Sequence, residues 1–363
     1  MNTVEKALMH GLFIHLHHNI DKAIDFGVFR ELNEKVSRTS PGELLIGPDA
    51  NDDAAVFRMP DDSGLVAAKM ESHCSPCVPR PYDSAATGAG GAMRDVVAMG
   101  ARPLFLLDFI GTRPLEDEVI VGPCGFKGEC TCGSCEIMTS GDRVNLIVKG
   151  IRDMCETMGV YVVGGGLSTS FSDIVPAVVA AVIGRMVIDK PLTKPAKNIG
   201  DRLIMIGKTD NDGNDTLYRA GLADIMRPAL ALFNEEKATM EAALAVIKTG
   251  KVNACSDLGA AGIGAAVSES TRFGGLGAKV DLAKAPVKKD NLTPEEILIC
   301  ETQARMLFQV TPGDAAEVIA AAKSEGVEAV EIGEITGDKE AVFYYNEKEV
   351  ARIPHEPPAE LFE

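Results

Sequence analysis

The sequence predicts a two-domain fold in which each domain mixes helices and strands. The 363 residues exceed one ordinary compact domain, so about two domains are expected. Short apolar runs typical of buried strands alternate with helical segments in both halves. Between the halves, Pro191, Pro195 and Gly200 interrupt residues 189–201 and indicate a linker.

Helical and strand-like segments follow one another through the first half. Ser140 is of a type that caps helices, and apolar positions recur with helical spacing near the N-terminus. The elements expected in order are a helix at 4–36, a strand at 64–70, a Gly-rich stretch continuing as a helix within 85–99, a strand at 103–109, a helix from Ser140 to about 158, and buried strands at 161–163 and 175–183.

The second half repeats this alternation. Gly250 is placed to stop a helix, because glycine tolerates the left-handed backbone that follows a helix end. The clearest elements are a strand at 202–207, a helix at 235–250, strands at 252–255, 277–281 and 306–310, a helix at 313–325, and a strand at 329–335.

Composition narrows the class of protein. The net charge of −17 argues against a general nucleic-acid-binding surface. Residues 175–187 are apolar but too short to span a membrane, and His15, His17 and His18 interrupt any signal-type apolar core. A cytoplasmic location is therefore expected, with no membrane or nucleic-acid partner. Nine cysteines in that setting favour metal binding or reactive thiols over disulfides.

The stretch from Lys69 to Pro103 is the richest in chemically useful residues. Lys69, Glu71 and His73 alternate along a predicted strand, so their side chains can share one side. A cation, a carboxylate and an imidazole together are costly to bury without partners. We expect them to line a site.

A Gly-rich segment, Thr87 to Gly91, follows within the same stretch. A glycine loop that opens a helix lets backbone N–H groups approach a phosphate. Arg94 and Asp95 are then expected in the first turns of the helix, where arginine suits phosphate and aspartate suits a hard cation. A Gly-rich turn with a surface ion pair is the alternative, and the joint presence of Glu71 and His73 favours the site.

These residues resemble a known family. The run K-M-E-S-H from Lys69, followed by P-Y-D-S-A-A-T-G-A-G-G-A-M-R-D and M-G-A-R-P, is similar to the signature of the family that includes AIR synthase and formylglycinamide ribonucleotide (FGAR) amidotransferase. The second half also resembles it, in D-L-G-A-A-G from Asp257, T-P-E-E-I from Thr293, E-T-Q-A-R-M from Glu301 and I-G-E-I-T from Ile332. The resemblance extends from about Ile46 to Pro354.

The resemblance implies a fold and an activity. The fold would be AIR synthase-like, α/β and α+β, with an N-terminal dimerising α/β domain at 1–190 and a C-terminal α+β domain at 200–354. The activity would be that of an ATP- and Mg²⁺-dependent C–N ligase, which phosphorylates an amide or carbonyl oxygen before a nitrogen nucleophile displaces phosphate. Conversion of FGAR to FGAM in purine biosynthesis is the leading assignment.

The resemblance also implies roles for individual residues. His73 would be the general base. ATP would be bound by Lys69, Asp52 and Asp53, and its phosphates would lie at Gly88, Gly90 and Gly91. The substrate would be bound by Ser72, Arg94, Glu301, Thr302 and Gln303. Mg²⁺ would be bound by Glu71, Asp95 and Asp257.

The chain departs from the family pattern at several positions. Cys74 and Ser75 replace an Asn-His pair, and Ala231 stands where the family has a substrate-binding glutamine. Two alternatives therefore stay open. One is a related enzyme with another substrate, including sulfur or selenium chemistry or another phosphoryl transfer, and the other is a non-catalytic metal- or nucleotide-binding relative.

Partners follow from the same resemblance. A phosphorylated small molecule is expected as substrate, and ammonia would come from solution or from a glutaminase partner subunit. Single-unit members of the family pair through their N-terminal domains, so a homodimer is expected, which would bury apolar surface that a lone unit exposes.

A second group of candidate residues lies within the Cys-rich insertion at 123–136. Four closely spaced thiols in a Gly-rich loop favour a zinc ion or an iron–sulfur cluster, and a reduced loop without ligand is the alternative. The four are Cys124, Cys130, Cys132 and Cys135. Cys74 and Cys77 add a nearby C-x-x-C of undecided role, whereas Cys155, Cys255 and Cys300 fall on predicted core elements.

Overall fold

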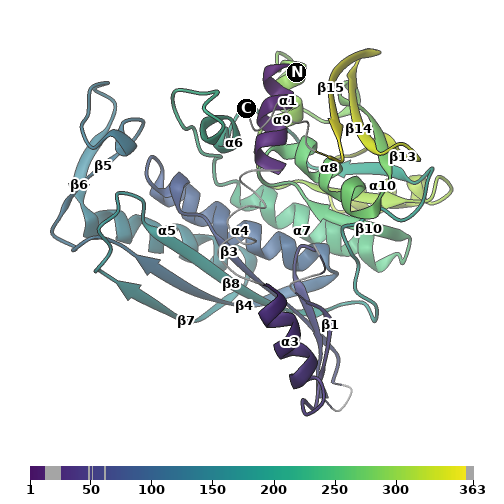
Figure 1. Cartoon of the computed structure of the whole chain (residues 1–363), viewed down its shortest axis with the longest axis horizontal. Helices are drawn as coiled ribbons and strands as arrows, with labels where there is room; N and C mark the ends of the chain where they lie inside the picture. The colour runs from purple at the N-terminus through teal and green to yellow at the C-terminus, as the bar shows by residue number, and fades with distance from the viewer. Residues whose placement is uncertain (13–25, 48–49, 51, 61–62, 357–363) are drawn as a thin grey trace.

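The computed structural model describes the chain except residues 13–25, 48–49, 51, 61–62 and 357–363. Two mixed sheets lie on either side of a central layer of helices, as Figure 1 shows. This arrangement confirms the expected two-domain α/β and α+β organisation, with the linker between the sheets.

The N-terminal sheet has six strands in the order β1-β2-β3-β8-β4-β7. Neighbouring strands are antiparallel except β4 and β7, which are parallel. The strands are β1 (Glu43–Ile46), β2 (Ala55–Arg58), β3 (Leu65–Ser72), β4 (Ala101–Gly111), β7 (Tyr161–Ser168) and β8 (Ala177–Met186).

Two long helices cover one face of this sheet. Helix α4 (Pro81–Ala98) begins with proline at its first turn, and α5 (Ser140–Met158) is capped by the Thr139 hydroxyl, one residue before the predicted cap. The expectation of a glycine loop before a helix is wrong, because residues 85–91 lie in the interior of α4.

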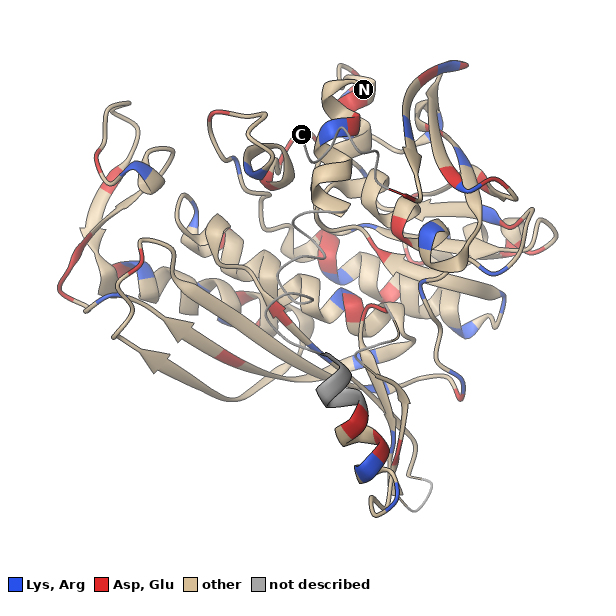
Figure 2. Cartoon of the chain, in the orientation of Figure 1, with Lys and Arg blue, Asp and Glu red and all other residues tan. Residues whose placement is uncertain are grey.

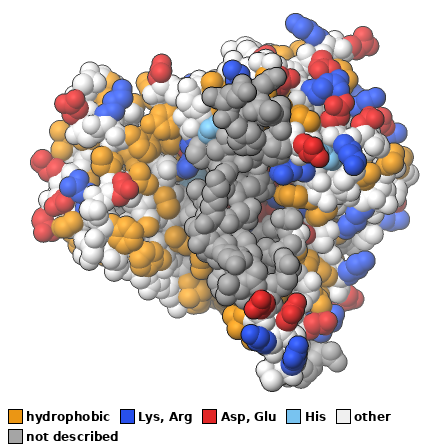
Figure 3. All heavy atoms as spheres, in the orientation of Figure 1, with side chains coloured by type: hydrophobic (Ala, Val, Ile, Leu, Met, Phe, Trp, Pro, Cys, Tyr) orange, Lys and Arg blue, Asp and Glu red, His pale blue; other side chains and the backbone are white. Residues whose placement is uncertain are grey.

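The opposite face of the N-terminal sheet is open and apolar. Phe105, Leu107 and Phe109 alternate on β4 and are 37–39% exposed, while Leu106 is buried. The prediction of a buried strand at 161–163 is also wrong, because Tyr161 on the edge strand β7 is 75% exposed. Figure 3 shows hydrophobic side chains gathered on the left lobe, where Figure 1 places β4, β7 and β8.

The C-terminal sheet has seven strands in the order β10-β12-β9-β13-β11-β14-β15. Only β11 and β14 pair in parallel among its neighbouring strands in the described chain. The strands are β9 (Arg202–Ile206), β10 (Val252–Asp257), β11 (Gly277–Asp281), β12 (Met306–Val310), β13 (Ala329–Thr336), β14 (Glu340–Tyr345) and β15 (Lys348–Pro354).

Helices cover both faces of this sheet. On β9, Ile204 and Ile206 face a core shared with the N-terminal domain, whereas Leu203 and Met205 face a second core. Helices α7 (Phe233–Lys248) and α10 (Ala315–Ser324) belong to the shared core. Helices α8 (Gly262–Gly274) and α9 (Pro294–Ile299) belong to the second core. The shorter helical elements are α6 (Asp215–Arg219), η3 (Ser75–Cys77) and η5 (Leu282–Lys284).

The N-terminal helix packs on the C-terminal domain. Leu8 of α1 (Thr3–His10) is fully buried in the second core and lies against Gly264, where an added Cβ would come within 2.4 Å. The expected first domain, 1–190, therefore begins with a helix that is part of the second domain's core. The expected helix at 4–36 is described as α1 and α3 (Phe26–Val36), and His15, His17 and His18 lie outside the described residues.

A two-stranded arm projects from the N-terminal domain. It consists of β5 (Glu118–Val121) and β6 (Glu136–Thr139), joined by a loop that contains η4 (Gly125–Lys127) and the four clustered cysteines. Among the helices of the described residues, none has the length and apolar character needed to cross a membrane.

Candidate functional site

A pocket of about 430 Å³ lies between the two domains. It is lined by the end of β3, the middle of α4, the linker, and segments that follow β10 and α9. Its described lining holds seven carboxylates and four lysine or arginine side chains. Figure 2 shows acidic and basic residues gathered where α4 meets the C-terminal domain. The excess of carboxylates means that a polyphosphate needs accompanying cations to enter.

Strand β3 and the residue that follows it deliver three side chains to this pocket. Lys69, Glu71 and His73 all line it, as their alternation predicts. The Lys69 ammonium lies 2.8 Å from a carboxylate oxygen of Asp95 and 3.4 Å from one of Glu71. Burial lowers the pKa of Lys69, but these two carboxylates raise it by more. The net pKa is therefore raised, and the ammonium stays charged. Ser72 also lines the pocket.

His73 is oriented by α4. Its Nδ1 lies 2.5 Å from the carbonyl oxygen of Ser84, which can only accept, so Nδ1 carries the proton of that bond. The Nε2 atom of the neutral ring is then the proton acceptor. A Cβ on Gly88 would lie 2.6 Å from the Cβ of His73, so only glycine allows β3 and α4 to approach this closely.

The three candidate phosphate-binding glycines lie inside α4. Residues within a helix use their N–H groups for its own hydrogen bonds, so the amides of Gly88, Gly90 and Gly91 do not form the predicted phosphate loop. Gly90 faces α7, where a Cβ would lie 3.1 Å from a Glu236 oxygen. Gly91 lines the pocket and leaves space there, with its nearest such contact, on Arg94, at 3.7 Å. These glycines make room for neighbouring groups.

Three aspartates converge in the pocket. Each of Asp53, Asp95 and Asp257 places an oxygen within 4.8 Å of the other two. Burial raises the pKa of Asp53 to about 7, against the lowering effect of Lys194, and burial also raises the pKa of Asp95 well above its ordinary range. One oxygen of Asp53 is buried without a hydrogen-bond partner in the described chain.

This donor set fits a magnesium ion. Magnesium prefers carboxylate oxygens, and a cation would relieve the mutual repulsion of the three aspartates and satisfy the orphaned oxygen. Asp53, expected at the nucleotide, joins Asp95 and Asp257 in this set, whereas Glu71, also expected to bind Mg²⁺, lies 3.4 Å from the Lys69 ammonium. The carboxylate of Asp52 instead accepts backbone N–H groups of Lys194 and Asp53 and lies outside the pocket lining.

Lys194 is a pocket residue that the sequence interpretation missed. Its ammonium lies 2.5 Å from Asp53 and 3.0 Å from Glu269 of α8. It stands in the linker, which was expected only to connect the domains. No sequence motif surrounds it, so its role depends on the linker running past the aspartates.

Arg94 is fully buried and holds the two domains together. Its guanidinium donates to Glu236 of α7, to Asp257 at 3.2 Å and to the Gln303 side-chain oxygen at 2.5 Å. Burial lowers the pKa of Arg94, but Glu236 and Asp257 raise it by more, so the net pKa is raised. Glu236 was missed because a single acid in the first turn of a helix is common and usually exposed.

The segment 301–303 lies beside the pocket, but its side chains diverge. The Glu301 carboxylate accepts the N–H and hydroxyl of Thr216 and lines the pocket together with Gln303. Thr302 is fully buried and points to Asp210 and Asp212, away from the pocket lining, so direct substrate contact by its side chain is not supported.

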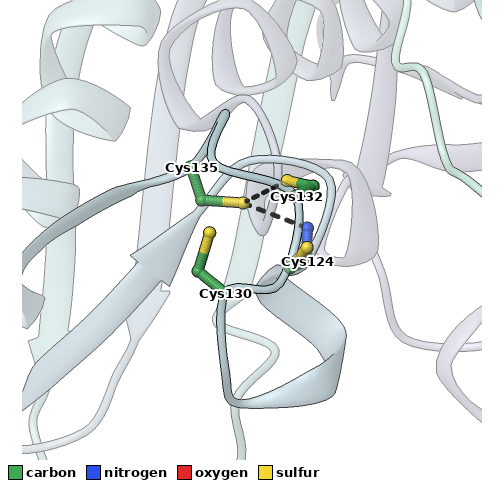
Figure 4. A group of neighbouring side chains, drawn as sticks. All are labelled: Cys124, Cys130, Cys132 and Cys135. Atoms are coloured by element: carbon green, nitrogen blue, oxygen red, sulfur yellow. Dashed lines mark hydrogen bonds between the residues drawn. The ribbon is translucent and has the colours of Figure 1, made fainter.

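The four loop cysteines converge outside this pocket. Sulfur atoms of Cys124, Cys130, Cys132 and Cys135 all lie within 4.8 Å of one another, and Figure 4 shows them facing a common centre.

The remaining cysteines lie elsewhere. Cys77 is buried, with its thiol 3.0 Å from the His73 carbonyl oxygen, and Cys74 lines the pocket. Neither joins the cluster. Cys155, Cys255 and Cys300 are buried, as expected.

Comparisons with known proteins match both halves of the chain. The model of the AIR synthase related protein N-terminal domain matches residues 51–186, and that of the C-terminal domain matches residues 198–346. Phosphoribosylformylglycinamidine synthase subunit PurL of Methanocaldococcus jannaschii is 34% identical over 97% of this chain and 46% of its own length.

Solved structures of PurL are also similar to this chain. T. maritima PurL complexed with FGAR has a TM-score of 0.71 and 27% identity, over 89% of this chain and 49% of that one. T. maritima PurL complexed with ATP has a TM-score of 0.64 and 29% identity, over 80% of this chain and 43% of that one. The chain thus spans about half the length of the relatives it matches.

Proposed function

Because the chain belongs to the AIR synthase related protein family, we propose that it catalyses the ATP-dependent conversion of FGAR to FGAM. The FGAR amide oxygen attacks the γ-phosphorus of ATP and ADP leaves. Ammonia then adds to the activated carbon, and inorganic phosphate departs. The observation that carries this proposal is the convergence of Lys69, His73 and three aspartates in one interdomain pocket.

The polar side chains of the pocket divide the work. Asp53, Asp95 and Asp257 would hold Mg²⁺, which when bound neutralises the phosphates of ATP. Lys69 and Lys194 are the lysines at the same place, and each would turn from its aspartate partner to a phosphate oxygen. Positioning of the amide oxygen against the γ-phosphate supplies much of the rate.

His73 would accept the proton of the incoming ammonia. Its Nδ1–H is fixed on the Ser84 carbonyl, so Nε2 is the atom available as base. Ammonia from solution supports the reaction in this proposal, and a glutaminase partner subunit would raise its local concentration.

The direct test is a reaction of the purified chain with Mg-ATP, FGAR and ammonium chloride. We expect ADP, phosphate and FGAM in equal amounts, followed by coupled ADP assay and mass spectrometry. ADP release that does not depend on FGAR would contradict the assignment.

A second candidate function rests on Cys74. Its thiol lines the pocket next to His73, at a position where the family carries an amide side chain. The corresponding reaction would be ATP-dependent phosphorylation of a related substrate, with sulfur or selenium chemistry. Replacing FGAR by selenide or a thiol donor in the same assay separates the two, because phosphate release would then follow the chalcogen compound.

The metal assignment predicts that Asp95→Asn affects the affinities for ATP with and without Mg²⁺ differently. Loss of a ligand should weaken binding of Mg-ATP at least about tenfold, since even outer partners of metal ligands are worth about 10–100-fold. Binding of ATP without Mg²⁺ should be unchanged or stronger, because Lys69 loses its partner at Asp95. Calorimetric titrations with and without Mg²⁺ measure both.

Asp52→Asn is the matched control for that experiment. It removes a neighbouring charge outside the pocket lining and leaves an oxygen for the N–H of Lys194. Equal weakening of Mg-ATP by both variants would argue against Asp95 as a ligand.

We also propose that the open face of the N-terminal sheet pairs with a second copy of the chain. Leu107 and Phe109 on β4 stand beside Ala181 and Val179 on β8, which makes a continuous uncharged surface. Such an exposed apolar face indicates an interface.

Leu107→Asp should therefore convert a dimer to a monomer, which light scattering after size exclusion would detect as halving of the mass. Leu222→Asp, at a similarly exposed leucine outside this sheet, should leave the dimer intact. A wild-type monomer at micromolar concentration would contradict the proposal.

A further inference from the structure

The arm formed by β5 and β6 has little apolar core of its own. Val119 and Cys124 are its buried hydrophobic residues in the described chain. An isolated two-stranded ribbon is marginally stable in water, and a long loop without regular structure is unusual inside a folded domain. The loop at 122–135 therefore needs another source of order.

The backbone of this loop is shaped around the cysteine sulfurs. The N–H of Cys124 donates to the sulfur of Cys135 at 3.2 Å, and the N–H of Ser134 donates to that of Cys132 at 3.4 Å. Gly133, with φ of 69°, makes the left-handed turn between Cys132 and Cys135. These two N–H donations fix the loop backbone around the cysteine sulfurs.

The sulfur separations distinguish a single ion from a cluster. A tetrahedral zinc ion with Zn–S bonds of about 2.3 Å holds its four sulfurs about 3.8 Å apart. Here the sulfurs of Cys132 and Cys135 are 3.6 Å apart, and all four lie within 4.8 Å. An iron–sulfur cluster places several irons and bridging sulfides among its cysteines, so it requires a wider separation.

From this geometry we propose that Cys124, Cys130, Cys132 and Cys135 bind one structural zinc ion. Four protein ligands complete a tetrahedral shell and leave no open position for substrate, so the ion has a structural role. The site is separate from the interdomain pocket, since no cysteine of the four lines that pocket.

The zinc site also braces one border of the pocket. Phe126, in the short helix between Cys124 and Cys130, packs on Tyr218 with ring centroids 5.4 Å apart. Tyr218 belongs to α6, whose residues Thr216 and Arg219 line the pocket. Zinc therefore fixes the loop that supports α6.

Metal analysis of the full chain tests the site directly. Protein purified in a phosphine reductant and dialysed against micromolar zinc should contain one zinc per chain by plasma mass spectrometry, with no stoichiometric iron. Replacement by Co²⁺ should give the intense near-ultraviolet charge-transfer absorption of thiolate ligands. Zinc-free protein, or one or more irons per chain, would overturn the proposal.

Variants assign the ligands. Cys130→Ser with Cys132→Ser removes two exposed thiols, so the core is spared and zinc affinity in chelator competition should fall at least about 100-fold. Ser134→Ala, in the same loop, should retain one zinc. Retention of zinc by the double variant would show that other groups bind it and would overturn the assignment.

Hydrogen exchange tests the bracing role. Removal of zinc by a chelator should accelerate amide exchange in residues 215–222 of the wild type, because Phe126 loses its fixed position. Phe126→Ala should keep the zinc and show the same acceleration. Unchanged exchange in both cases would overturn the bracing role. The zinc content of the protein would still decide whether the four cysteines bind zinc.

Discussion

His73→Ala should slow turnover by about 10²–10⁴-fold, the usual worth of general-base assistance, with little change in the affinity for Mg-ATP. Imidazole is the side chain that most readily exchanges a proton near neutral pH. The ring is held by the Ser84 carbonyl and faces the pocket, outside the aspartate triad. Steady-state turnover and calorimetric titration of ATP measure the two quantities separately.

Two further variants separate chemistry from structure. His73→Asn can retain the hydrogen bond to Ser84 through its amide N–H but provides no base, so it should be as slow as His73→Ala. His355→Ala removes a histidine outside the pocket and should leave turnover unchanged. If His73→Asn is fully active, or if the loss in His73→Ala disappears when rates are corrected for the folded fraction, His73 is not the base.

Local patterns predicted the strand side of the site correctly. Alternation depends only on the strand period, so it places Lys69 and Glu71 of β3 and the following residue, His73, on one side of the chain. The glycine run in α4 was misread because glycine loops and glycine-lined helix contacts look alike in sequence. Here the contact that requires Gly88 comes from His73, just after β3, and the nearest neighbour of an added Cβ at Gly90 is Glu236 of α7.

Long-range packing explains the other differences. Apolar runs are similar in buried strands and in interfaces, so the exposure of Tyr161 on β7 could not be read from the residues. Lys194 and Glu236 meet their partners only when the two domains pack. The four cysteines, by contrast, are close in sequence, and their convergence was predictable from spacing.

The buried ion pair between Arg94 and α7 gives the largest expected effect on stability. Arg94→Met removes the cation from a site where Glu236 stays buried, and breaking a buried pair from one side costs about 3–5 kcal/mol. Urea denaturation followed by circular dichroism should show this loss in the free energy of unfolding. Adding Glu236→Leu to Arg94→Met should recover part of it, because the uncompensated carboxylate is removed.

Arg102→Met is a matched control for this effect. Arg102 also links the N-terminal sheet to α7, through both oxygens of Glu241, but the two side chains are each 41% exposed. Water and salt screen such a pair, so its loss should cost only about 0.2–1 kcal/mol. Burial is thus the variable that differs between two arginine contacts to the same helix. Equal losses for Arg94→Met and Arg102→Met would mean that the domains are held by their shared apolar core, with no special contribution from the buried arginine.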